Sequence, residues 1–280
     1  CIPQRMLGTY FSHNGALKPL SEAKLSLDNI ELVYGFGVYE NLRVRHGKIF
    51  FPELHVERLL HSATILRLEH TFRSDAILVF LQELVKANDV YDANIKILLL
   101  GAGSREQAQL YIMSLNPLFS HKDIYKNGVK AILYKGEREF PQAKSLSMLM
   151  SYLAFREAKQ QQAYDALLMD RNGCITEGTR TNIFFTDGRI LYTPPAEKVL
   201  AGVTRKLVID LAKSSGLLVV EKELKAEELQ QYAGFFLTST SAKILPLTTI
   251  QDKQFPIPDL VNELMASFDL FLDEYAERHT

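Results

Sequence analysis

Four short segments of the chain carry side chains that could bind a charged ligand or react with it. The first, residues 176–182 (TEGTRTN), places a carboxylate, hydroxyl groups, a guanidinium and an amide at a turn between two expected strands. Polar groups at such a junction are typical of a ligand site, although a solvated turn has the same composition. The second is Lys144, which leads into an apolar helical segment where partial desolvation would favour its uncharged, nucleophilic amine. A single lysine is far more often a solvated charge, so this residue alone indicates little.

The other two segments could bind an anion through backbone N–H groups. Residues 202–205 (GVTR) begin a predicted helix, and the first turn of a helix leaves N–H groups unpaired beside the positive end of the helix dipole. Residues 238–241 (TSTS) form a hydroxyl-rich turn after a predicted strand. Each segment also fits an ordinary capped helix or a serine–threonine turn, so neither identifies a function by itself.

The first third of the chain alternates strands and helices around these segments. A hairpin is predicted over residues 39–51, with Gly47 supplying a positive φ at its turn. Pro52 is placed to begin the next helix, over residues 52–69, because proline is favoured at the first helical position. Apolar periodicity adds a second helix over 75–87 and two buried strands over 94–100 and 110–114.

The rest of the chain is richer in strands. Strands are predicted over 129–134, 165–170, 182–186, 189–192, 235–238 and 243–249, and helices over 147–162, 203–215, 226–232 and 258–277. Residues 117–128 show no periodicity and contain turn-forming residues, so they are the predicted linker. We therefore predict an α+β or α/β fold with two domains: a small N-terminal α/β domain (1–116), the linker (117–128) and a larger strand-rich C-terminal domain (129–280).

The composition argues against several classes of protein. The 32 Lys and Arg residues balance 33 Asp and Glu residues, so nucleic acid is not an expected partner. The only cysteines are Cys1 and Cys174, without zinc-type spacing, so neither a disulfide framework nor a metal site is expected. No segment approaches the roughly 20 apolar residues of a membrane span. Residues 1–8 lack the apolar core of a secretory signal. The expected location is the cytoplasm.

Six blocks of the sequence, in order, resemble the class IV aminotransferase family of pyridoxal phosphate (PLP) enzymes. This family includes D-amino-acid and branched-chain aminotransferases and aminodeoxychorismate lyase. The blocks are residues 34–40 (YGFGVYE), 55–59 (HVERL), 144–149 (KSLSML), 165–185, 200–205 (LAGVTR) and 236–246. Six ordered blocks over nearly the whole chain are far more specific than any one of them. The resemblance implies the two-domain fold of fold-type IV PLP enzymes, in the form of a homodimer.

The resemblance also assigns the two central chemical roles. Lys144 would hold PLP as a Schiff base and then move a proton between the substrate Cα and the cofactor C4′. Glu177 would bind the pyridine nitrogen and keep it protonated, so that the ring acts as an electron sink.

The remaining matched residues would bind the cofactor or the substrate, again as the resemblance implies. The phosphate would be bound by Arg58, the backbone amides of Val203 and Thr204, and Thr240, since an arginine can bind phosphate through two N–H groups. Other contacts are assigned to Leu200 against the ring, Asn182 behind the strand of Glu177, and Tyr34 and Ser241 near the substrate.

Several positions depart from the subfamily patterns. Phe36 stands where an aspartate or a small residue is common, which would reshape the substrate side, and Leu149 replaces the tyrosine of branched-chain enzymes. The arginine-and-histidine loop of D-amino-acid enzymes is not evident after Leu100. Arg180 occupies a position where small residues are usual, and Arg43 matches an arginine often found in branched-chain forms. We hypothesise that Arg180, with Arg43, binds the substrate carboxylate; the alternative is that Arg180 faces solvent or a structural carboxylate.

Three functions follow from these patterns. The first is a PLP-dependent aminotransferase that moves an amino group between an amino acid, of D or branched-chain type, and a 2-oxo acid by a ping-pong cycle. The second is a PLP lyase similar to aminodeoxychorismate lyase, which releases pyruvate. The third is a non-catalytic member of the fold, which the presence of both Lys144 and Glu177 disfavours. Residues 37–40 (GVYE) favour the first.

Overall fold

The computed structural model describes residues 5–25, 28–117 and 122–278. The chain divides into two compact units, each of which combines separate segments. The first contains Cys1–Phe119, Ala143–Ser147 and Tyr275–Thr280, and the second contains Ser120–Gln142 and Met148–Glu274. In this division the segment with Lys144 groups with the N-terminal residues. The predicted domain bounds at residues 116 and 129 stay a prediction from the sequence.

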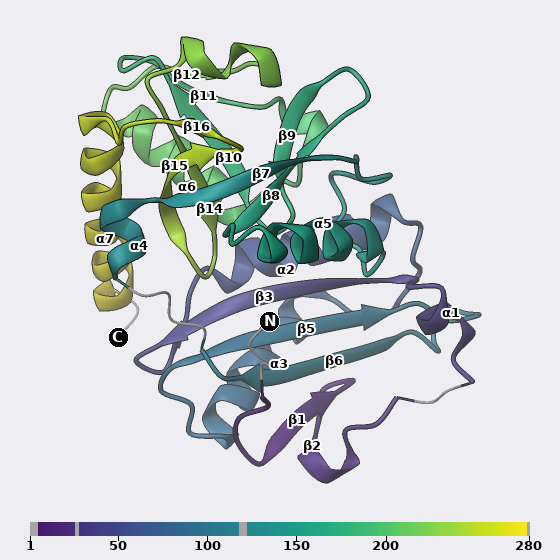
Figure 1. Cartoon of the computed structure of the whole chain (residues 1–280). Helices are drawn as coiled ribbons and strands as arrows, with labels where there is room; N and C mark the ends of the chain where they lie inside the picture. Colours follow the sequence, from purple (N-terminus) through teal and green to yellow (C-terminus); the bar gives the residue numbers. More distant parts are fainter. Residues whose placement is uncertain (1–4, 26–27, 118–121, 279–280) are drawn as a thin grey trace. The chain divides into compact units, whose positions relative to one another are not determined.

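A six-stranded antiparallel sheet forms the first unit, in the order β2-β1-β6-β5-β3-β4 (Figure 1). Its strands are β1 (Tyr10–His13), β2 (Ala16–Pro19), β3 (Gly37–Arg45), β4 (Lys48–Ile49), β5 (Ala93–Leu100) and β6 (Gln109–Leu115). The predicted hairpin of β3 and β4 is confirmed. Both of its turn residues adopt positive φ, 53° at His46 and 73° at Gly47, the combination that lets a two-residue loop follow the twist of the strands.

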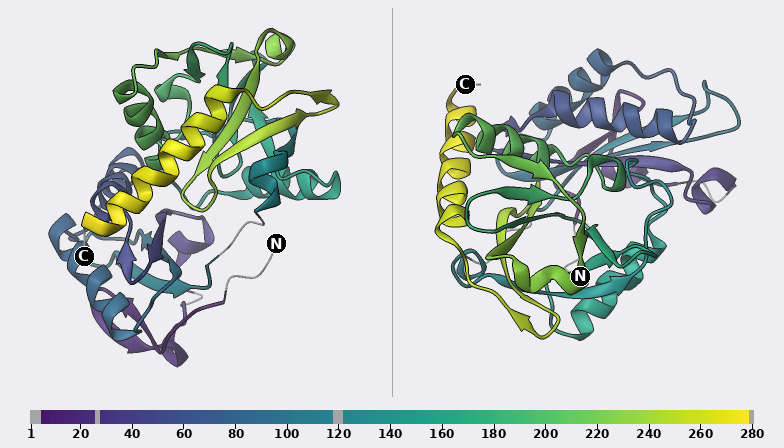
Figure 2. Two further views of the ribbon diagram at one scale, coloured as in Figure 1. Left: turned by 90° about the vertical axis from the view of Figure 1, so that its left-hand side faces the viewer. Right: turned by 90° about the horizontal axis from the view of Figure 1, so that it is seen from above.

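Two helices cover one face of this sheet, as Figures 1 and 2 show: α2 (Pro52–Ile65) and α3 (Ser74–Ala87). The core between the helices and the sheet contains fully buried side chains, among them Leu59, Leu81 and Ile97. Pro52 begins α2 as predicted, but the helix ends four residues before Glu69. The reason is local, because Arg67 adopts a left-handed φ of 53° and the N–H of Leu68 bonds back to the carbonyl of Ala63. The short segments η1 (Leu20–Glu22) and α1 (Ile30–Val33) complete the unit.

The second unit is built on a ring of six strands. They are β7 (Val129–Lys135), β8 (Asp165–Met169), β9 (Cys174–Gly178), β10 (Asn182–Thr186), β14 (Gly234–Ser239) and β15 (Lys243–Ile250). The ring closes because β9 pairs with both β8 and β10, while β14, β15 and β7 complete the circuit. Four shorter strands extend it: β11 (Leu191–Thr193), β12 (Val219–Glu221), β13 (Leu224–Lys225) and β16 (Lys253–Gln254). Buried aromatic side chains such as Phe185 and Phe235 fill the core.

The helices of this unit are α4 (Asp123–Asn127), α5 (Leu149–Gln160), α6 (Val203–Ser214) and most of α7 (Asp259–Arg278), with short η2 (Ala196–Lys198) and η3 (Ala226–Gln231). Residues 118–121 of the predicted linker lie outside the described residues, and much of the remainder is α4. The helix predicted over 226–232 is a 3-10 helix, and Leu229 is its single buried side chain. None of the described helices is both long and apolar enough to cross a membrane.

The start of α5 also differs from the prediction, with a clear physical cause. The backbone just before it is hydrogen-bonded to β3: the N–H of Tyr39 donates to the carbonyl of Lys144, and the N–H of Leu146 donates to that of Gly37. Residues 144–146, held in this strand-like bridge, cannot also be helical. The helix begins after them, at Leu149 instead of residue 147.

Candidate functional site

The carboxylate of Glu177, on β9, lies in the interior of the second unit with 3% of its surface exposed. Its Oε2 accepts hydrogen bonds from the N–H of Leu200 (3.1 Å) and from Nδ2 of Asn182 (3.2 Å). Its Oε1 lies 2.9 Å from Nε of Arg138. An ionised carboxylate is stable in the interior only with such partners. These contacts therefore fix the direction of the Glu177 side chain and supply the partners that an ionised carboxylate requires.

Asn182 connects this carboxylate to the neighbouring strands. It lies directly opposite Glu177 in the β9–β10 pair and opposite Thr238 in the β10–β14 pair. Its Nδ2 also donates to the carbonyl of Leu200 (3.0 Å). The structure thus brings Glu177, Asn182 and Leu200 together, three residues that the sequence had placed in one site.

The N-terminus of α6 begins against the same asparagine. A Cβ atom on Gly202 would collide with Oδ1 of Asn182, so only glycine allows the backbone to approach this closely. No side chain caps the helix at Gly202, and the side chains of Val203 and Thr204 are buried. The first N–H groups of α6 therefore keep the geometry that suits an anion.

A buried hydroxyl group faces the same side of the sheet. Thr238 is directly opposite Asn182, so the two side chains share one face. Its Oγ1 is buried and has no hydrogen-bond partner among the described residues, which is unusual for a polar atom inside a protein and points to a missing ligand atom or water. Thr240 and Ser241 follow in the turn between β14 and β15, half-buried and exposed respectively.

In the first unit, Lys144 is held by its backbone. Its N–H donates to Oγ of Ser62 (3.0 Å), whose hydroxyl donates to the carbonyl of Arg58 (2.8 Å), and its carbonyl accepts from Tyr39. Its Nζ lies 4.6 Å from the centre of the Tyr39 ring. The lysine is half-buried, and its amine extends from a backbone fixed by both β3 and α2.

Arg58 has a buried partner that the sequence analysis missed. Its Nε and Nη2 donate to the two oxygens of Glu40, at 2.7 and 2.8 Å, and Nδ1 of His55 lies 2.8 Å from the same carboxylate. Burial alone would raise the pKa of Glu40, but Arg58 and His55 outweigh it and lower this pKa from 4.5 to about 2. Burial lowers the pKa of His55, against the effect of Glu40, so we treat the imidazole as neutral. The three-residue spacing of His55 and Arg58, which places them on one helix face, was the available signal.

Three of the predicted substrate residues, Tyr34, Phe36 and Arg43, belong to the first unit. Tyr34 follows α1 and is 78% exposed. Phe36 is half-buried, and its ring fills the space where a Cβ on Gly101 would lie. Arg43 lies on β3 opposite Asn94, five residues beyond the position that pairs with the Lys144 segment. Side chains alternate along a strand, so Arg43 projects on the same face as Tyr39.

Arg180 lies in the turn between β9 and β10, with an exposed side chain. Its guanidinium carbon lies 3.9 Å from the centre of the Phe155 ring, on α5. This close stacking restricts the guanidinium plane while its N–H groups still reach solvent.

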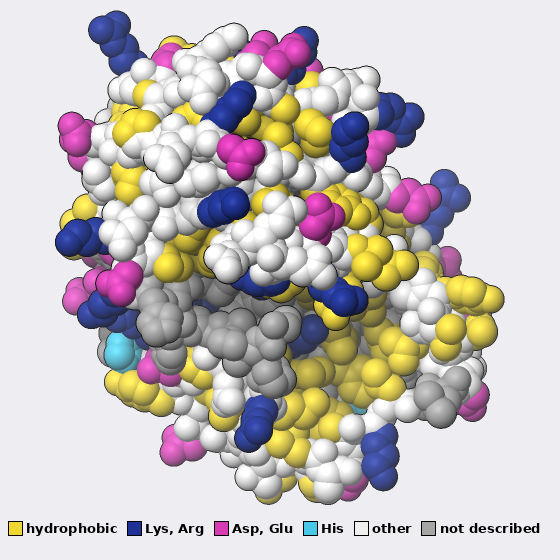
Figure 3. All heavy atoms as spheres, viewed as in Figure 1, with side chains coloured by type: hydrophobic (Ala, Val, Ile, Leu, Met, Phe, Trp, Pro, Cys, Tyr) yellow, Lys and Arg dark blue, Asp and Glu magenta, His cyan; other side chains and the backbone are white. Residues whose placement is uncertain are grey.

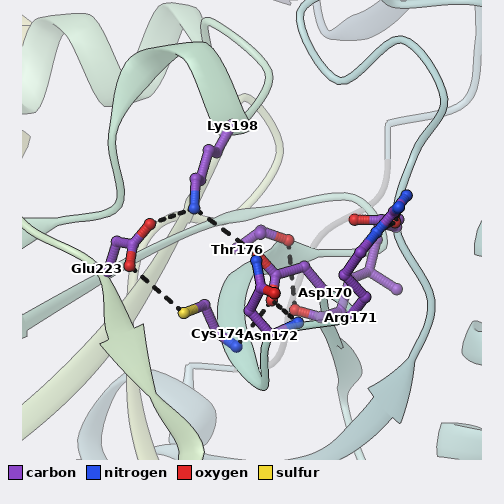
Figure 4. Close-up of polar contacts among 9 residues, drawn as sticks. Asp170, Arg171, Asn172, Cys174, Thr176, Lys198 and Glu223 are labelled. Carbon is purple, nitrogen blue, oxygen red and sulfur yellow. Dashed lines mark hydrogen bonds and ion pairs between the residues drawn. The ribbon is translucent and has the colours of Figure 1, made fainter.

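A cavity of about 240 Å³ borders the Glu177–Arg138 pair in the second unit. It is lined by Glu137, Arg138, Pro141, Asp170, Arg171, Asn172, Thr176, Glu177, Glu197 and Lys198. Figure 4 shows that Lys198 points between Glu223 and Asp170, and that Cys174 approaches Glu223 from the other side. Most charged groups around the cavity thus have an opposite charge beside them.

Comparison with known proteins identifies relatives along most of the chain. The profile of the family described as Amino-transferase class IV matches residues 37–250. A probable branched-chain-amino-acid aminotransferase of Rickettsia conorii is 32% identical over 247 residues, 85% of each chain. A D-alanine aminotransferase of Bacillus licheniformis is 30% identical over 249 residues, 85% of this chain and 87% of its own length. An aminodeoxychorismate lyase of Bacillus subtilis is 29% identical over 254 residues, 86% and 87% of the two chains.

The chain is also similar in structure to solved aminotransferases. The branched-chain aminotransferase of Thermoproteus uzoniensis with norvaline has a TM-score of 0.86 and 26% identity, over 94% of both chains. The T.th. branched-chain amino acid aminotransferase with pyridoxamine 5′-phosphate has a TM-score of 0.86 and 25% identity, over 95% of this chain and 94% of its own.

The buried Glu40–Arg58 pair predicts a pH-dependent stability. A carboxyl group whose pKa falls from 4.5 to about 2 on folding stabilises the protein above pH 4.5. This contribution, on the order of 3 kcal/mol, is lost as the pH falls toward 2. Glu40→Gln should therefore lower the free energy of unfolding at pH 7 by about 3–5 kcal/mol, because Arg58 stays buried without a counter-charge. Urea unfolding, followed by circular dichroism at pH 7, 4 and 3, measures the free energy of unfolding of the wild type and of the variant.

The difference in unfolding free energy between wild type and Glu40→Gln should shrink at the lower pH values. Below pH 4.5 the Glu40 carboxyl is protonated in the unfolded chain and must lose that proton on folding. Asp75→Asn is the matched control, because Asp75 also pairs with an arginine, Arg73, but on the surface. It should change stability little. A constant difference between pH 7 and pH 3 would contradict the proposed charge on Glu40.

Proposed function

Because this chain belongs to the class IV aminotransferase family and is a PLP-dependent aminotransferase, we propose that Lys144 and Glu177 are its central residues. The observation that supports this most is the buried Glu177 carboxylate, held by two amides and a guanidinium beside the uncapped start of α6. The second unit thus offers a fixed negative charge, an anion-binding helix end and the unpaired hydroxyl of Thr238. A pyridinium nitrogen and a phosphate group are the ligand parts that fit these features.

PLP, when bound, supplies an electron-withdrawing ring that makes the Cα proton of an amino acid removable. We assign to Glu177 the hydrogen bond to the pyridine nitrogen, with Asn182 behind it and Leu200 against the ring. The amides of Val203 and Thr204, together with Thr240, bind the phosphate. Arg58 contributes a further charge to the phosphate.

Lys144 performs the proton transfer in this proposal. Its Nζ would hold the cofactor as an imine, formed with loss of water. Once the substrate amine has displaced it, the free Nζ would carry a proton to and from the substrate Cα as a general base and acid. The hydrogen bonds of its backbone to Ser62 and Tyr39 fix the starting point of the side chain. The amine is therefore pre-positioned, which lowers the entropy that must be lost to reach the reacting atom.

The substrate is an amino acid of D or branched-chain type and the acceptor a 2-oxo acid, exchanged by a ping-pong cycle. Two relatives named as aminotransferases support this substrate class, one branched-chain and one D-alanine. Tyr34, Phe36 and Ser241 are assigned to the substrate side. A second candidate is a PLP lyase that releases pyruvate, because one relative of comparable coverage is named aminodeoxychorismate lyase. The location in the cytoplasm stays a prediction.

Turnover by the purified protein tests the proposal directly. The wild type should have a visible cofactor band that borohydride removes. It should also convert an amino donor beyond one equivalent only when a 2-oxo acid is added; a panel of D- and L-amino acids identifies the donor. Lys144→Ala should lose this activity by at least about 10⁴-fold, because proton transfer and covalent binding are both removed. Continuous pyruvate release without an acceptor would favour the lyase instead.

Lys96→Ala is the matched control, since the amine of Lys96 lies 5.7 Å from the centre of the same Tyr39 ring. It should keep the band and the activity. A Lys144→Ala protein in which borohydride still fixes the cofactor to the chain would refute the assignment of Lys144.

Arg180 is proposed to bind the substrate carboxylate, with Arg43 as a second contact. Arg180→Ala should raise the KM for the amino acid about tenfold or more, with a smaller effect on kcat, since a charged hydrogen bond contributes about 1.5–3 kcal/mol. Steady-state kinetics measure this, and the same measurement on Arg43→Ala tests the second contact. Arg156→Ala is the control, because Arg156 lies over the Tyr152 ring instead. An unchanged KM in Arg180→Ala would mean that this arginine only stacks on Phe155.

A homodimer is proposed as the working assembly. One face of α5 carries exposed apolar side chains: Leu149 is 71% exposed, Tyr152 53% and Leu153 45%. Figure 3 shows such apolar groups among Lys and Arg side chains over this helix. A cluster of this kind marks a surface that is buried in an assembly. The wild type should therefore elute with twice the mass of one chain in light scattering, and Tyr152→Glu with Leu153→Glu should yield monomers. Leu270→Glu, at an exposed site of α7, should stay dimeric; a monomeric wild type would contradict the proposal.

A further inference from the structure

Arg138 joins the Glu177 carboxylate although no sequence pattern singled it out. It lies in the segment after β7, six positions before Lys144 in the sequence. Its Nε is 2.9 Å from Oε1 of Glu177, and its Nη2 donates to the carbonyl of Thr179 at 2.9 Å. Two contacts, one through Nε and one through Nη2 of the same planar guanidinium, fix its position and orientation. The carboxylate is therefore met by a cation that is itself held in place.

The partners of the two Glu177 oxygens differ in kind. Oε2 accepts from the N–H of Leu200 and from Nδ2 of Asn182, which are neutral donors. Oε1 faces the full positive charge of Arg138, whose side chain is 14% exposed. Neutral donors orient a carboxylate, whereas a cation at this distance also favours its ionised form. The ion pair thus adds what the amides cannot supply, a counter-charge for a side chain that is 3% exposed.

The other basic side chains at the neighbouring cavity have acidic partners of their own. Arg171 pairs with Glu137 at 2.6 Å, and Lys198 pairs with Glu223 and Asp170 (Figure 4). The cavity, of about 240 Å³, reaches both Arg138 and Glu177. A small cation from solution can therefore approach the carboxylate if the arginine side chain is removed.

We propose that Arg138 is the positioning residue of Glu177: it keeps this carboxylate ionised and aims it at the pyridine nitrogen of the cofactor. The inference rests on the proposed role of Glu177. Arg138 touches neither the substrate nor the reacting atoms in this proposal, and it acts through the carboxylate alone. Its removal should therefore weaken cofactor binding only as long as residue 177 is a carboxylate.

A double-mutant cycle on cofactor affinity tests this dependence. PLP is titrated into the cofactor-depleted full-length chain, and the Kd is taken from the visible absorbance. Arg138→Met should raise the Kd about tenfold or more, because the buried carboxylate loses its counter-charge. In a Glu177→Gln background the same substitution should change the Kd by less than about twofold, since a neutral amide needs no counter-charge.

Three further measurements separate positioning from mere structural support. Arg138→Lys should bind PLP more tightly than Arg138→Met, because an ammonium group restores the positive charge. Methylguanidinium at millimolar concentration should partly restore PLP affinity to Arg138→Met, through the cavity, but not to the double mutant. The acid limb of PLP binding should move to higher pH in Arg138→Met, since the carboxylate is then protonated more easily.

Arg171→Met is the matched control, because Arg171 lines the same cavity but pairs with Glu137. It should leave the Kd unchanged. If Glu177→Gln alone binds PLP like the wild type, the proposed role of Glu177 fails. If Glu177→Gln weakens binding but Arg138→Met has its full effect in that background, the inference about Arg138 fails. Should Arg138→Met not fold, Arg138→Gln and Arg138→Lys complete the same cycle.

Discussion

Placing an ionised carboxylate inside a protein costs several kcal/mol unless charges and hydrogen bonds replace the lost water. Glu177 meets this requirement with partners from distinct segments: Asn182 from β10, the N–H of Leu200 before α6, and Arg138 after β7. These contacts constrain much of the second unit. β9 must pair with β10 for Asn182 to lie opposite Glu177, and that pairing closes the strand ring. α6 must begin beside Asn182, which requires Gly202.

The first unit also contains a buried carboxylate, Glu40, that needs charged or hydrogen-bonding partners. This carboxylate is fully buried on β3 and is balanced by Arg58 and His55 from α2, so the ion pair fixes the helix against the sheet. The Lys144 backbone is attached to this assembly, through Ser62 on α2 and through Tyr39 on β3. In each unit, a buried carboxylate organises the backbone that carries the proposed reactive or cofactor-binding residue.

The two groups of proposed residues differ in how strongly the fold restrains them. Glu177, Asn182 and Leu200 are buried and bonded to one another. The proposed substrate residues Tyr34 and Arg180 are exposed, and Arg180 stacks on an aromatic ring. Exposed side chains can change without unfolding the core. This contrast fits relatives that match most of this chain under different names: a probable branched-chain aminotransferase, a D-alanine aminotransferase and an aminodeoxychorismate lyase.

The sequence by itself determined the family, the PLP chemistry and most central elements. Apolar periodicity and turn residues are local signals, so the hairpin at Gly47, the proline start of α2 and the strands of the β3–β5–β6 sheet were predictable. Local signals also misled at the start of α5. The helix was predicted from residue 147 but begins at Leu149, after a segment whose backbone bonds to β3.

Tertiary structure alone decided which charges meet. Glu40 and Arg58 are 18 residues apart, and Arg138 and Glu177 are 39 residues apart, since 177 − 138 = 39. Nothing in the residues between them encodes an ion pair. The pairing arises when strands and helices bury each carboxylate beside a cation that the packing brings within reach, and burial then makes that contact costly to lose. The family could thus be identified from ordered motifs, whereas the partners that set the charge of its central residues required the folded chain.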